Sequence, residues 1–344
     1  MLIHAAVLRA AGEPYTIEKL ELAGPGPGQI LVRIAGAGFC HTDLLGRVPG
    51  DLVPKPVILG HEGSGVVEAI GAGVNGVEVG DHVVLSFDSC GGCGTCLSGR
   101  PAYCDTFFPR NLGAAEGPIA GVLTGWFGQS SFATHAITGV RNVVVVDRDV
   151  PLELLGPLGC GVQTGAASVL LALGVTAGSS IAVYGAGAVG LSAVMAARVA
   201  GATTIVAVDL HEHRLELARS LGATHTFTDA SEVPPVLFGF DTTGVPSVIA
   251  AAVGALRPTG VLGLVGVGQG DLVLDGNALA SGKTIMGILE GGAVPQTFIP
   301  RLVELWKQGR FPFDRLITTF PLGDINAAEA ATLSGAVVKP VLLP

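Results

Sequence analysis

Charge is scarce in this chain, and most of it is negative. Charged residues make up 14% of the 344 residues, the net charge is −9 at pH 7, and Lys and Arg together number only 19. A surface this poor in basic residues has no stripe that could neutralise a phosphate backbone. Because 49% of the residues are hydrophobic, the chain is also unlike a disordered protein. The composition predicts a compact globular protein that does not bind nucleic acid.

Signals for export and membrane insertion are lacking as well. The first residues, MLIHAAVLRAAGEP, have no basic lead followed by a long apolar run and a small-residue cleavage site. Segment 179–197 has no charge and is nearly long enough to span a bilayer, but glycines interrupt it. A buried strand, a turn and a helix produce the same hydropathy. We therefore expect a cytoplasmic protein without a membrane partner.

The chain has no internal repeat and no low-complexity linker, but its pattern changes along its length. Short apolar runs broken by Gly and Pro fill the first third, which is typical of an all-β, barrel-like unit. From about residue 162, strand patterns precede helical patterns in turn, at 181–185 and 188–201, 204–209 and 211–222, and 240–244 and 245–260. This order is typical of a doubly wound parallel sheet, and it predicts an α/β protein.

The C-terminal part does not continue this alternation. Residues 298–314 have the pattern of an amphipathic helix, and residues 336–344 have that of a final strand. A chain of 344 residues is long enough for two cores. We predict one domain of residues 1–161 and 291–344 and a second domain of residues 162–290.

Residues 185–190, GAGAVG, match the G-x-G-x-x-G pattern of dinucleotide-binding loops. Gly185 would make the tight turn, Gly187 would let the backbone approach the pyrophosphate, and Gly190 would allow close packing of helix on strand. A chain with 52 glycines produces such a pattern by chance, so its context decides. An apolar strand leads in, a helix leads out, and Asp209 closes the next strand about 20 residues later. The loop therefore predicts a nucleotide site.

Asp209 also indicates which nucleotide binds. A carboxylate accepts hydrogen bonds from the ribose hydroxyls and would repel a 2′-phosphate, so NAD is favoured over NADP. Arg214 lies close enough in sequence to complicate this choice. We expect NAD as the cofactor.

Cysteine is rare, and its placement is uneven. Four of the six cysteines, Cys90, Cys93, Cys96 and Cys104, lie in one loop with the spacing C-x2-C-x2-C-x7-C. Four thiolates at such spacings suit a tetrahedral metal, and a closed shell of four cysteines leaves no position for substrate. A ferredoxin-type iron–sulfur run has a shorter last spacing, and a redox pair would not need four cysteines. The loop predicts a structural zinc site.

The other two cysteines, Cys40 and Cys160, are far apart in sequence. His61 follows Cys40 at a short distance, in LGHEGSGVV, and Cys160 lies in LLGPLGCGVQTG, where the first domain gives way to the second. The three residues make a set of two cysteines and one histidine, which with an open fourth position is typical of a catalytic zinc. We call it the Cys-His-Cys set. Taken singly, each residue also fits a buried structural role.

Together these motifs resemble the zinc-dependent medium-chain alcohol dehydrogenase family over essentially the whole chain. GHEGSGVV, the four-cysteine loop, the glycine loop with its Asp and the order of the two domains all match, and two cysteines with one histidine are the known catalytic zinc shell of alcohol dehydrogenases. CHTDLLGR, FGQSSFATHA, LGCGVQTGA and FIPRLVELWKQGRFPFDRLI are most similar to aryl-alcohol (benzyl alcohol) dehydrogenases. The resemblance implies a GroES-like β-barrel catalytic domain, a Rossmann domain, two zinc ions and a homo-oligomer, either dimer or tetramer.

The resemblance also implies roles for individual residues around the catalytic zinc. Cys40, His61 and Cys160 would bind the ion, and Thr42 would take the proton of the alcohol. Asp43 and Glu62 would support the ligands, with Asp43 orienting the His61 ring. The implied cofactor contacts beyond the glycine loop and Asp209 are His41, Arg214, Val265, Val267 and Lys339.

One departure from the family pattern concerns the path of the proton. Leu45 stands where many relatives carry a relay histidine, and Arg47 follows two positions later. An arginine stays protonated and is a poor base. We therefore expect Arg47 to orient groups electrostatically and not to accept the proton.

The implied activity is zinc-dependent hydride transfer between an alcohol and NAD, with an aryl alcohol and its aldehyde as the leading substrate pair. A dehydrogenase for aliphatic alcohols, polyols or formaldehyde is the alternative within the family. The complete Cys-His-Cys set disfavours a zinc-free quinone or enoyl reductase, and a non-catalytic NAD-binding subunit is a further alternative. Phe87, Trp126 and Phe127 are candidate pocket aromatics that fit an ordinary core equally well.

Overall fold

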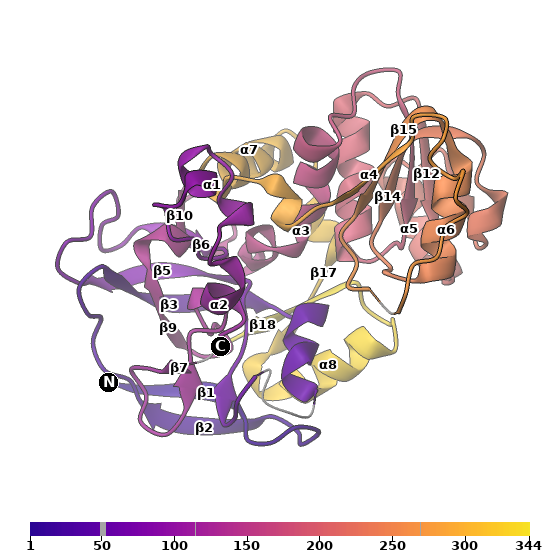
Figure 1. The fold of residues 1–344 in the computed structure, drawn as a ribbon. Helices are drawn as coiled ribbons and strands as arrows, with labels where there is room; N and C mark the ends of the chain where they lie inside the picture. Colours follow the sequence, from indigo (N-terminus) through magenta and orange to yellow (C-terminus); the bar gives the residue numbers. More distant parts are fainter. Residues whose placement is uncertain (49–52, 114, 269) are drawn as a thin grey trace. The chain divides into compact units, whose positions relative to one another are not determined.

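The structure is a computed structural model that describes residues 1–48, 53–113, 115–268 and 270–344. Its contacts divide the chain into two compact units, which we describe separately (Figure 1). Unit 1 comprises Met1–Cys160, Val294–Pro300 and Asp314–Pro344, and unit 2 comprises Gly161–Ala293 and Arg301–Phe313. The chain therefore crosses between the units directly after Cys160 and again around residues 294–313.

Unit 1 is built on two sheets. The larger sheet has the strand order β10-β6-β5-β3-β18-β17, with β9 also paired to β3. Its strands are β3 (Gln29–Gly38), β5 (Gly63–Ile70), β6 (His82–Leu85), β9 (His135–Gly139), β10 (Val143–Val146), β17 (Ile317–Pro321) and β18 (Lys339–Leu343). The smaller sheet has the order β2-β1-β4-β8-β7, with strands β1 (Leu2–Leu8), β2 (Thr16–Glu21), β4 (Val57–Ile58), β7 (Ala115–Glu116) and β8 (Leu123–Thr124). Antiparallel pairing prevails, as expected for an all-β unit of short strands.

The C-terminal strand β18 lies inside the larger sheet of unit 1. It pairs with β3 antiparallel, Val341 opposite Gly38 and Leu342 opposite Ala37, and with β17 parallel. All but its last residue are buried. Helix α8 (Ile325–Leu333) precedes it and packs against it. This arrangement brings Lys339, the first residue of β18, to the carboxyl end of β3.

Unit 2 is a parallel sheet with the strand order β13-β12-β11-β14-β15-β16. The strands are β11 (Ser180–Tyr184), β12 (Thr204–Val208), β13 (His225–Phe227), β14 (Val236–Asp241), β15 (Leu256–Leu264) and β16 (Thr284–Gly287), and the helices include α3 (Gly161–Ala167), α4 (Ala188–Ala200), α5 (Glu212–Leu221) and α6 (Pro246–Ala255). Residues 181–184 of β11 are almost fully buried, which explains their unbroken apolar run. The predicted doubly wound sheet is confirmed.

Two helices end differently from the sequence prediction. Helix α6 ends at Ala255 and β15 begins at Leu256, because Pro258 disfavours helical backbone in the residue before it. Helix α7 (Pro295–Lys307) ends before Gly309, which has φ +69°. The second half of α7 clusters with unit 2, where the buried Leu305 lines a hollow together with Val175 and Val199.

The apolar segment 179–197 folds as β11, the glycine loop and the first turns of α4. Its hydropathy therefore comes from a buried strand and a helix that packs on the sheet. Within the described residues, no helix combines the length and the apolar character that crossing a membrane requires.

Candidate metal and cofactor sites

The Cys-His-Cys set comes together in unit 1. One ligand atom from each of Cys40, His61, Glu62 and Cys160 lies within 4.8 Å of the others. Cys40 follows β3 and caps the 3-10 helix η1 (His41–Arg47), while His61 and Glu62 stand directly before β5. Cys160 follows a short 3-10 helix, η6 (Gly156–Gly159), at the end of the first stretch of unit 1. Residues from distant parts of the chain thus share one small volume.

Asp43 connects the members of this set. Its carboxylate is fully buried. It accepts hydrogen bonds from Nδ1 of His61 at 2.8 Å and from Nε1 of Trp126 at 3.0 Å. The backbone N–H groups of Cys40 and Gly60 donate to it at 3.1 and 3.2 Å. These donors compensate a buried negative charge that would otherwise be costly.

The other ring nitrogen of His61, Nε2, is buried and has no hydrogen-bond partner among the described residues. A buried polar atom left unpaired costs about 1–3 kcal/mol. Because Nδ1 donates to Asp43, Nε2 carries the lone pair that binds a metal. The thiols of Cys40 and Cys160 lie beside it, so the three residues fit a zinc ion with an open fourth position.

Electrostatics in the set favour a Cys40 thiolate and, while no metal is bound, a protonated His61 ring, which releases its Nε2 proton when it binds an ion. The neighbouring Cys160 side chain, aided by Lys339 and His61, lowers the pKa of the Cys40 thiol well below its usual value, although burial opposes this. Burial also disfavours a charged His61 ring, yet the Asp43 carboxylate raises the pKa of that ring well above its usual value. Since the thiolate is the form that binds metals, the shift at Cys40 agrees with the role of a ligand.

Glu62 is held by Lys339 inside unit 1. The Lys339 ammonium donates to both carboxylate oxygens of Glu62 at 2.9 Å and to the carbonyl of Phe39 at 3.1 Å. Both side chains are buried. Burial raises the pKa of Glu62 to about 7, although Lys339 opposes the shift. Lys339 therefore lies next to the Cys-His-Cys set, and its predicted contact with a cofactor phosphate stays a prediction.

Helix η1 carries three more of the predicted residues. The Thr42 hydroxyl lies 3.8 Å from Sγ of Cys40, beside the proposed metal site. His41 is exposed at the start of the helix. Arg47, at the end of the helix, directs its guanidinium to Glu329 of α8. The predicted role of Arg47 at the proton path stays a prediction, with its charge already paired to a carboxylate.

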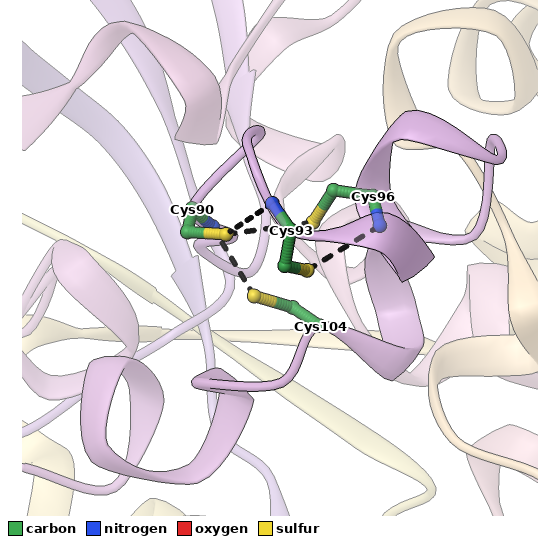
Figure 2. A group of neighbouring side chains, drawn as sticks. All are labelled: Cys90, Cys93, Cys96 and Cys104. Atoms are coloured by element: carbon green, nitrogen blue, oxygen red, sulfur yellow. Dashed lines mark hydrogen bonds between the residues drawn. The ribbon is translucent and has the colours of Figure 1, made fainter.

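The four remaining cysteines form a second cluster in unit 1. Figure 2 shows the sulfur atoms of the cluster turned toward a shared centre, and the four lie within 4.8 Å of one another. Sγ of Cys90 and Sγ of Cys96 are 4.0 Å apart, near the separation of about 3.8 Å expected for thiolates around tetrahedral zinc. Four sulfurs complete a tetrahedral shell, which fits a structural ion.

Backbone amides stabilise thiolates in this cluster. Sγ of Cys90 accepts hydrogen bonds from the N–H of Cys93 at 3.3 Å and of Gly92 at 3.4 Å. Against the effect of burial, hydrogen bonds from the Cys90 backbone and from Thr106 lower the pKa of Cys104 to about 6. Such N–H···S bonds are what a thiolate ligand needs around it. All six cysteines lie in the described residues, and none of them forms a disulfide that would compete for these sulfurs.

In unit 2, the glycine loop connects β11 to α4 as predicted. Gly185 adopts φ +93°, which favours glycine. A Cβ on Gly190 would lie 1.8 Å from the carbonyl oxygen of Gly185, so helix and strand approach as closely as the pattern implies. A Cβ on Gly187, the N-cap of α4, would meet nothing within 4 Å. Open space at this helix N-terminus fits a pyrophosphate.

Asp209 follows β12 and lies against this loop. Its Oδ2 accepts a hydrogen bond from the N–H of Ala186 at 2.7 Å, and its Oδ1 accepts one from the N–H of His211 at 2.9 Å. Nη1 of Arg214, on α5, is 3.9 Å from the same carboxylate. The carboxylate is therefore fixed at the edge where parallel strands bind nucleotides.

Val265 and Val267 lie just beyond β15, at the carboxyl edge of the sheet. The N–H of Val265 donates to the carbonyl of Asp241 at 3.0 Å, and the Val267 side chain is largely exposed. The structure brings these residues to the same edge as the glycine loop, because all of the strands in this sheet are parallel. Their contact with nicotinamide stays a prediction.

Sequence reasoning missed the part that Trp126 plays. Trp126 is fully buried and donates its indole N–H to Asp43, and Phe127 stacks on the His61 ring with centroids 4.5 Å apart. Nε2 of Gln129 donates to the carbonyl of His61 at 2.9 Å. Phe87 is also buried. The sequence signal for this role was a Trp three residues before a Gln, Trp126 and Gln129. The hydrogen-bond partner of Trp126 lies 83 residues away in sequence, so the signal did not identify it.

Comparison with known proteins identifies the family. The alcohol dehydrogenase GroES-like domain matches residues 26–148, and the zinc-binding dehydrogenase family matches residues 188–308. The geraniol dehydrogenase of Castellaniella defragrans is 44% identical, covering 98% of this chain and 97% of its own length. The chain belongs to the zinc-dependent medium-chain alcohol dehydrogenases. The resemblance inferred from the motifs is confirmed.

Solved structures of alcohol dehydrogenases agree with this assignment. A zinc-binding-domain alcohol dehydrogenase from Burkholderia ambifaria is 47% identical with a TM-score of 0.97, covering 100% of this chain and 99% of that one. The benzyl alcohol dehydrogenase from Acinetobacter calcoaceticus is 44% identical with a TM-score of 0.96, covering 100% and 99%. The predicted fold of a GroES-like domain and a Rossmann domain is thereby confirmed.

The four-cysteine cluster should support folding and not turnover. We expect Cys93→Ala to remove about one zinc ion per chain and to lower the free energy of unfolding by at least ~3 kcal/mol, because metal binding contributes directly to folding. Metal analysis and thermal denaturation measure both effects. Ser98→Ala, in the same loop but without a thiol, is the control. An unchanged zinc content in Cys93→Ala would contradict the assignment.

Substitutions of Gly190 and Gly187 should have different effects on the protein. Gly190→Ala should lower the free energy of unfolding by about 2 kcal/mol or more, since its Cβ would collide with the Gly185 carbonyl. Gly187→Ala should fold normally but raise the Kd for NADH roughly tenfold, because its Cβ fills open space at the helix N-terminus. Thermal denaturation and fluorescence titration with NADH measure these effects. Normal NADH binding by Gly187→Ala would count against a pyrophosphate site there.

Proposed function

We propose that this alcohol dehydrogenase oxidises primary alcohols to aldehydes with NAD as the hydride acceptor, and that aryl alcohols are its preferred substrates. The observation that carries the proposal is the unpartnered, buried Nε2 of His61 beside the thiols of Cys40 and Cys160, among the residues that the structure describes. Three ligands with an open position are the arrangement of a catalytic zinc and not of a structural one. Family membership supports the general activity.

Cys40, His61 and Cys160 would hold a zinc ion, which when bound supplies a Lewis acid for the alcohol oxygen. Asp43 keeps the proton on Nδ1 of His61, so that Nε2 stays available as a ligand. Lys339 donates two hydrogen bonds to the Glu62 carboxylate, one oxygen of which lies within 4.8 Å of the three ligand atoms. In this proposal, the four-cysteine cluster holds a second zinc ion that has no part in the reaction.

Thr42 is the residue placed to handle the substrate proton. Its Oγ1 lies 3.8 Å from Sγ of Cys40, next to where the alcohol oxygen would lie. Thr42 accepts the hydroxyl proton at Oγ1 and releases its own proton outward, since a hydroxyl both accepts and donates. Leu45 cannot carry the proton further, so the proton leaves from Thr42 to water.

The cofactor would occupy unit 2 at the carboxyl edge of the parallel sheet, where bound NAD supplies the acceptor for the hydride. Gly187 and the N-terminus of α4 would face the pyrophosphate, and the Asp209 carboxylate would accept the ribose hydroxyls. Asp209 is held by two backbone N–H groups, and this position disfavours a 2′-phosphate.

Two similar enzymes support the proposed substrate class. One is named for geraniol and the other for benzyl alcohol, and each is 44% identical to this chain. Both alcohols carry the hydroxymethyl group on an unsaturated carbon. A pocket that prefers an sp2 carbon next to the reacting carbon would accept either compound. The benzyl-type segments of the sequence favour the aryl alcohol.

Removal of one ligand should separate catalysis from folding. Cys160→Ala should lower kcat at least ~1000-fold, because a two-residue site no longer holds the Lewis acid, while NADH binding and the melting temperature stay close to the wild type. Steady-state kinetics, zinc analysis and NADH titration measure these quantities. Turnover close to the wild-type value would exclude Cys160 from the catalytic metal site.

The substrate class can be tested with pairs of alcohols of similar size. We expect kcat/KM for benzyl alcohol to exceed that for cyclohexylmethanol about tenfold or more. We also expect kcat/KM for geraniol to exceed that for citronellol, its 2,3-saturated analogue. Each pair is measured with NAD and with NADP, and NAD should be preferred. A preference for the saturated alcohols would refute the aryl assignment and leave the general dehydrogenase activity standing.

A further inference from the structure

Helix η1 carries the proposed proton acceptor, Thr42, and is fixed at both ends. At its N-terminus, the Asp43 carboxylate accepts the N–H of Cys40, and the Cys40 side chain completes a capping box. Near its C-terminus, Gly46 is buried with Leu59 and Leu8 so close that a Cβ would lie 2.4 Å from Leu59. The last residue of the helix, Arg47, supplies the remaining contacts.

The guanidinium of Arg47 is engaged on several sides. Nε donates to Oε1 of Glu329 at 2.7 Å, Nη2 donates to Oε2 of the same carboxylate, and Nη1 donates to the carbonyl of Glu13. The cation also lies 4.6 Å from the centre of the Tyr15 ring. The side chains of Arg47 and Glu329 are 19% and 9% exposed, so this bidentate pair is shielded from water far better than an ordinary surface pair.

Helix α8 holds the other members of this cluster. Glu329 and Asn326 lie three residues apart on α8 and therefore on one face. Asn326 accepts the N–H of Tyr15 at 2.8 Å and donates to its carbonyl at 2.9 Å. One face of α8 thus holds the loop at Tyr15 and the end of η1 together. We name Arg47, Glu329, Tyr15 and Asn326 the η1 anchor.

The η1 anchor argues against a direct electrostatic role for Arg47. Its positive charge is already matched by the Glu329 carboxylate, whose hydrogen bond raises the pKa of Arg47. A cation that stabilises charge on a substrate needs to be oriented toward that substrate. Here the N–H groups of the guanidinium donate to a carboxylate and to a backbone carbonyl, and its planar face lies over an aromatic ring. Its geometry suits holding the helix.

We propose that Arg47 and Glu329 are positioning residues that keep η1, and with it the Thr42 hydroxyl, in register with the Cys-His-Cys set. The proposal rests on the proposed function, in which Thr42 takes the substrate proton. The residues that hold the two ends of η1 all belong to unit 1. Without the ion pair, η1 would lose its bidentate contact with α8 and keep the contacts of Asp43 and Gly46. A small displacement of Thr42 would slow proton transfer without removing a zinc ligand or a cofactor contact.

The test is a double-mutant cycle with Arg47→Met, Glu329→Gln and the double variant. Each single change should lower kcat roughly tenfold, and the double variant should be no slower than either, since both break one interaction. Arg47→Lys should behave like Arg47→Met, because an ammonium does not reproduce a bidentate fork. Zinc content and the Kd for NADH should stay unchanged. Glu18→Gln, which breaks the more exposed Arg9–Glu18 pair, is the control and should leave kcat unchanged.

Opposite outcomes would overturn the proposal. If Arg47 acts through its charge, Arg47→Lys will keep most of the activity and Glu329→Gln will leave it unchanged or raise it. Additive losses in the double variant would likewise exclude a shared positioning role.

A second readout does not depend on turnover. Amide hydrogen exchange at Asp43 and Val48, whose N–H groups bond within or next to η1, should be faster in Arg47→Met and Glu329→Gln than in the wild type or in Glu18→Gln. Unchanged exchange would exclude the anchor. If the wild type oxidises no alcohol, the proposed function fails, while exchange still decides whether the pair holds the helix.

Discussion

The buried carboxylate of Asp43 is the interaction on which the candidate active site depends. A buried charge is tolerated only when its lone pairs are satisfied, and here the donors come from His61, Trp126 and the backbone of Cys40 and Gly60. These hydrogen bonds bring η1, the segment before β5 and the turn at Trp126 together around the Asp43 carboxylate. The same contacts decide which nitrogen of His61 faces the two thiols. The Asp43 side chain therefore both holds these segments of unit 1 together and orients the His61 ring of the Cys-His-Cys set.

The two candidate metal sites differ in how their ligands are brought together. The four-cysteine cluster is local, since its ligands follow one another within a short loop and its thiolates are supported by amides of that loop. A saturated shell of this kind stabilises the loop and excludes substrate. The Cys-His-Cys set is assembled from distant segments and keeps a ligand position open. The Glu62–Lys339 pair and the Phe127 ring, which stacks on His61, lie beside this set, and the η1 anchor holds the end of the helix that carries Thr42.

Unit 2 places its functional groups by topology. Parallel strands send their carboxyl ends to one edge, so the glycine loop after β11, Asp209 after β12 and Val265 after β15 share that edge although they are far apart in sequence. Asp209 is further fixed by the N–H of Ala186, which belongs to the glycine loop itself. The glycine loop and Asp209, the residue proposed to select the nucleotide, are therefore held together.

The sequence by itself determined the local chemistry of this protein. Spacing sufficed for the cysteine loop, the glycine loop and the unbroken apolar strands, because a turn, a helix start and a tetrahedral shell depend on residues that are neighbours in the chain. The ends of α6 and α7 differ from the prediction, since Pro258 and Gly309 end the helical backbone before the apolar pattern ends. The tertiary structure alone decided that Trp126 donates to Asp43, that Lys339 is bound to Glu62 and that the charge of Arg47 rests on Glu329. Those partners lie 83, 277 and 282 residues apart. No local spacing encodes such contacts, because they arise only when the buried polar groups of a folded chain must find one another.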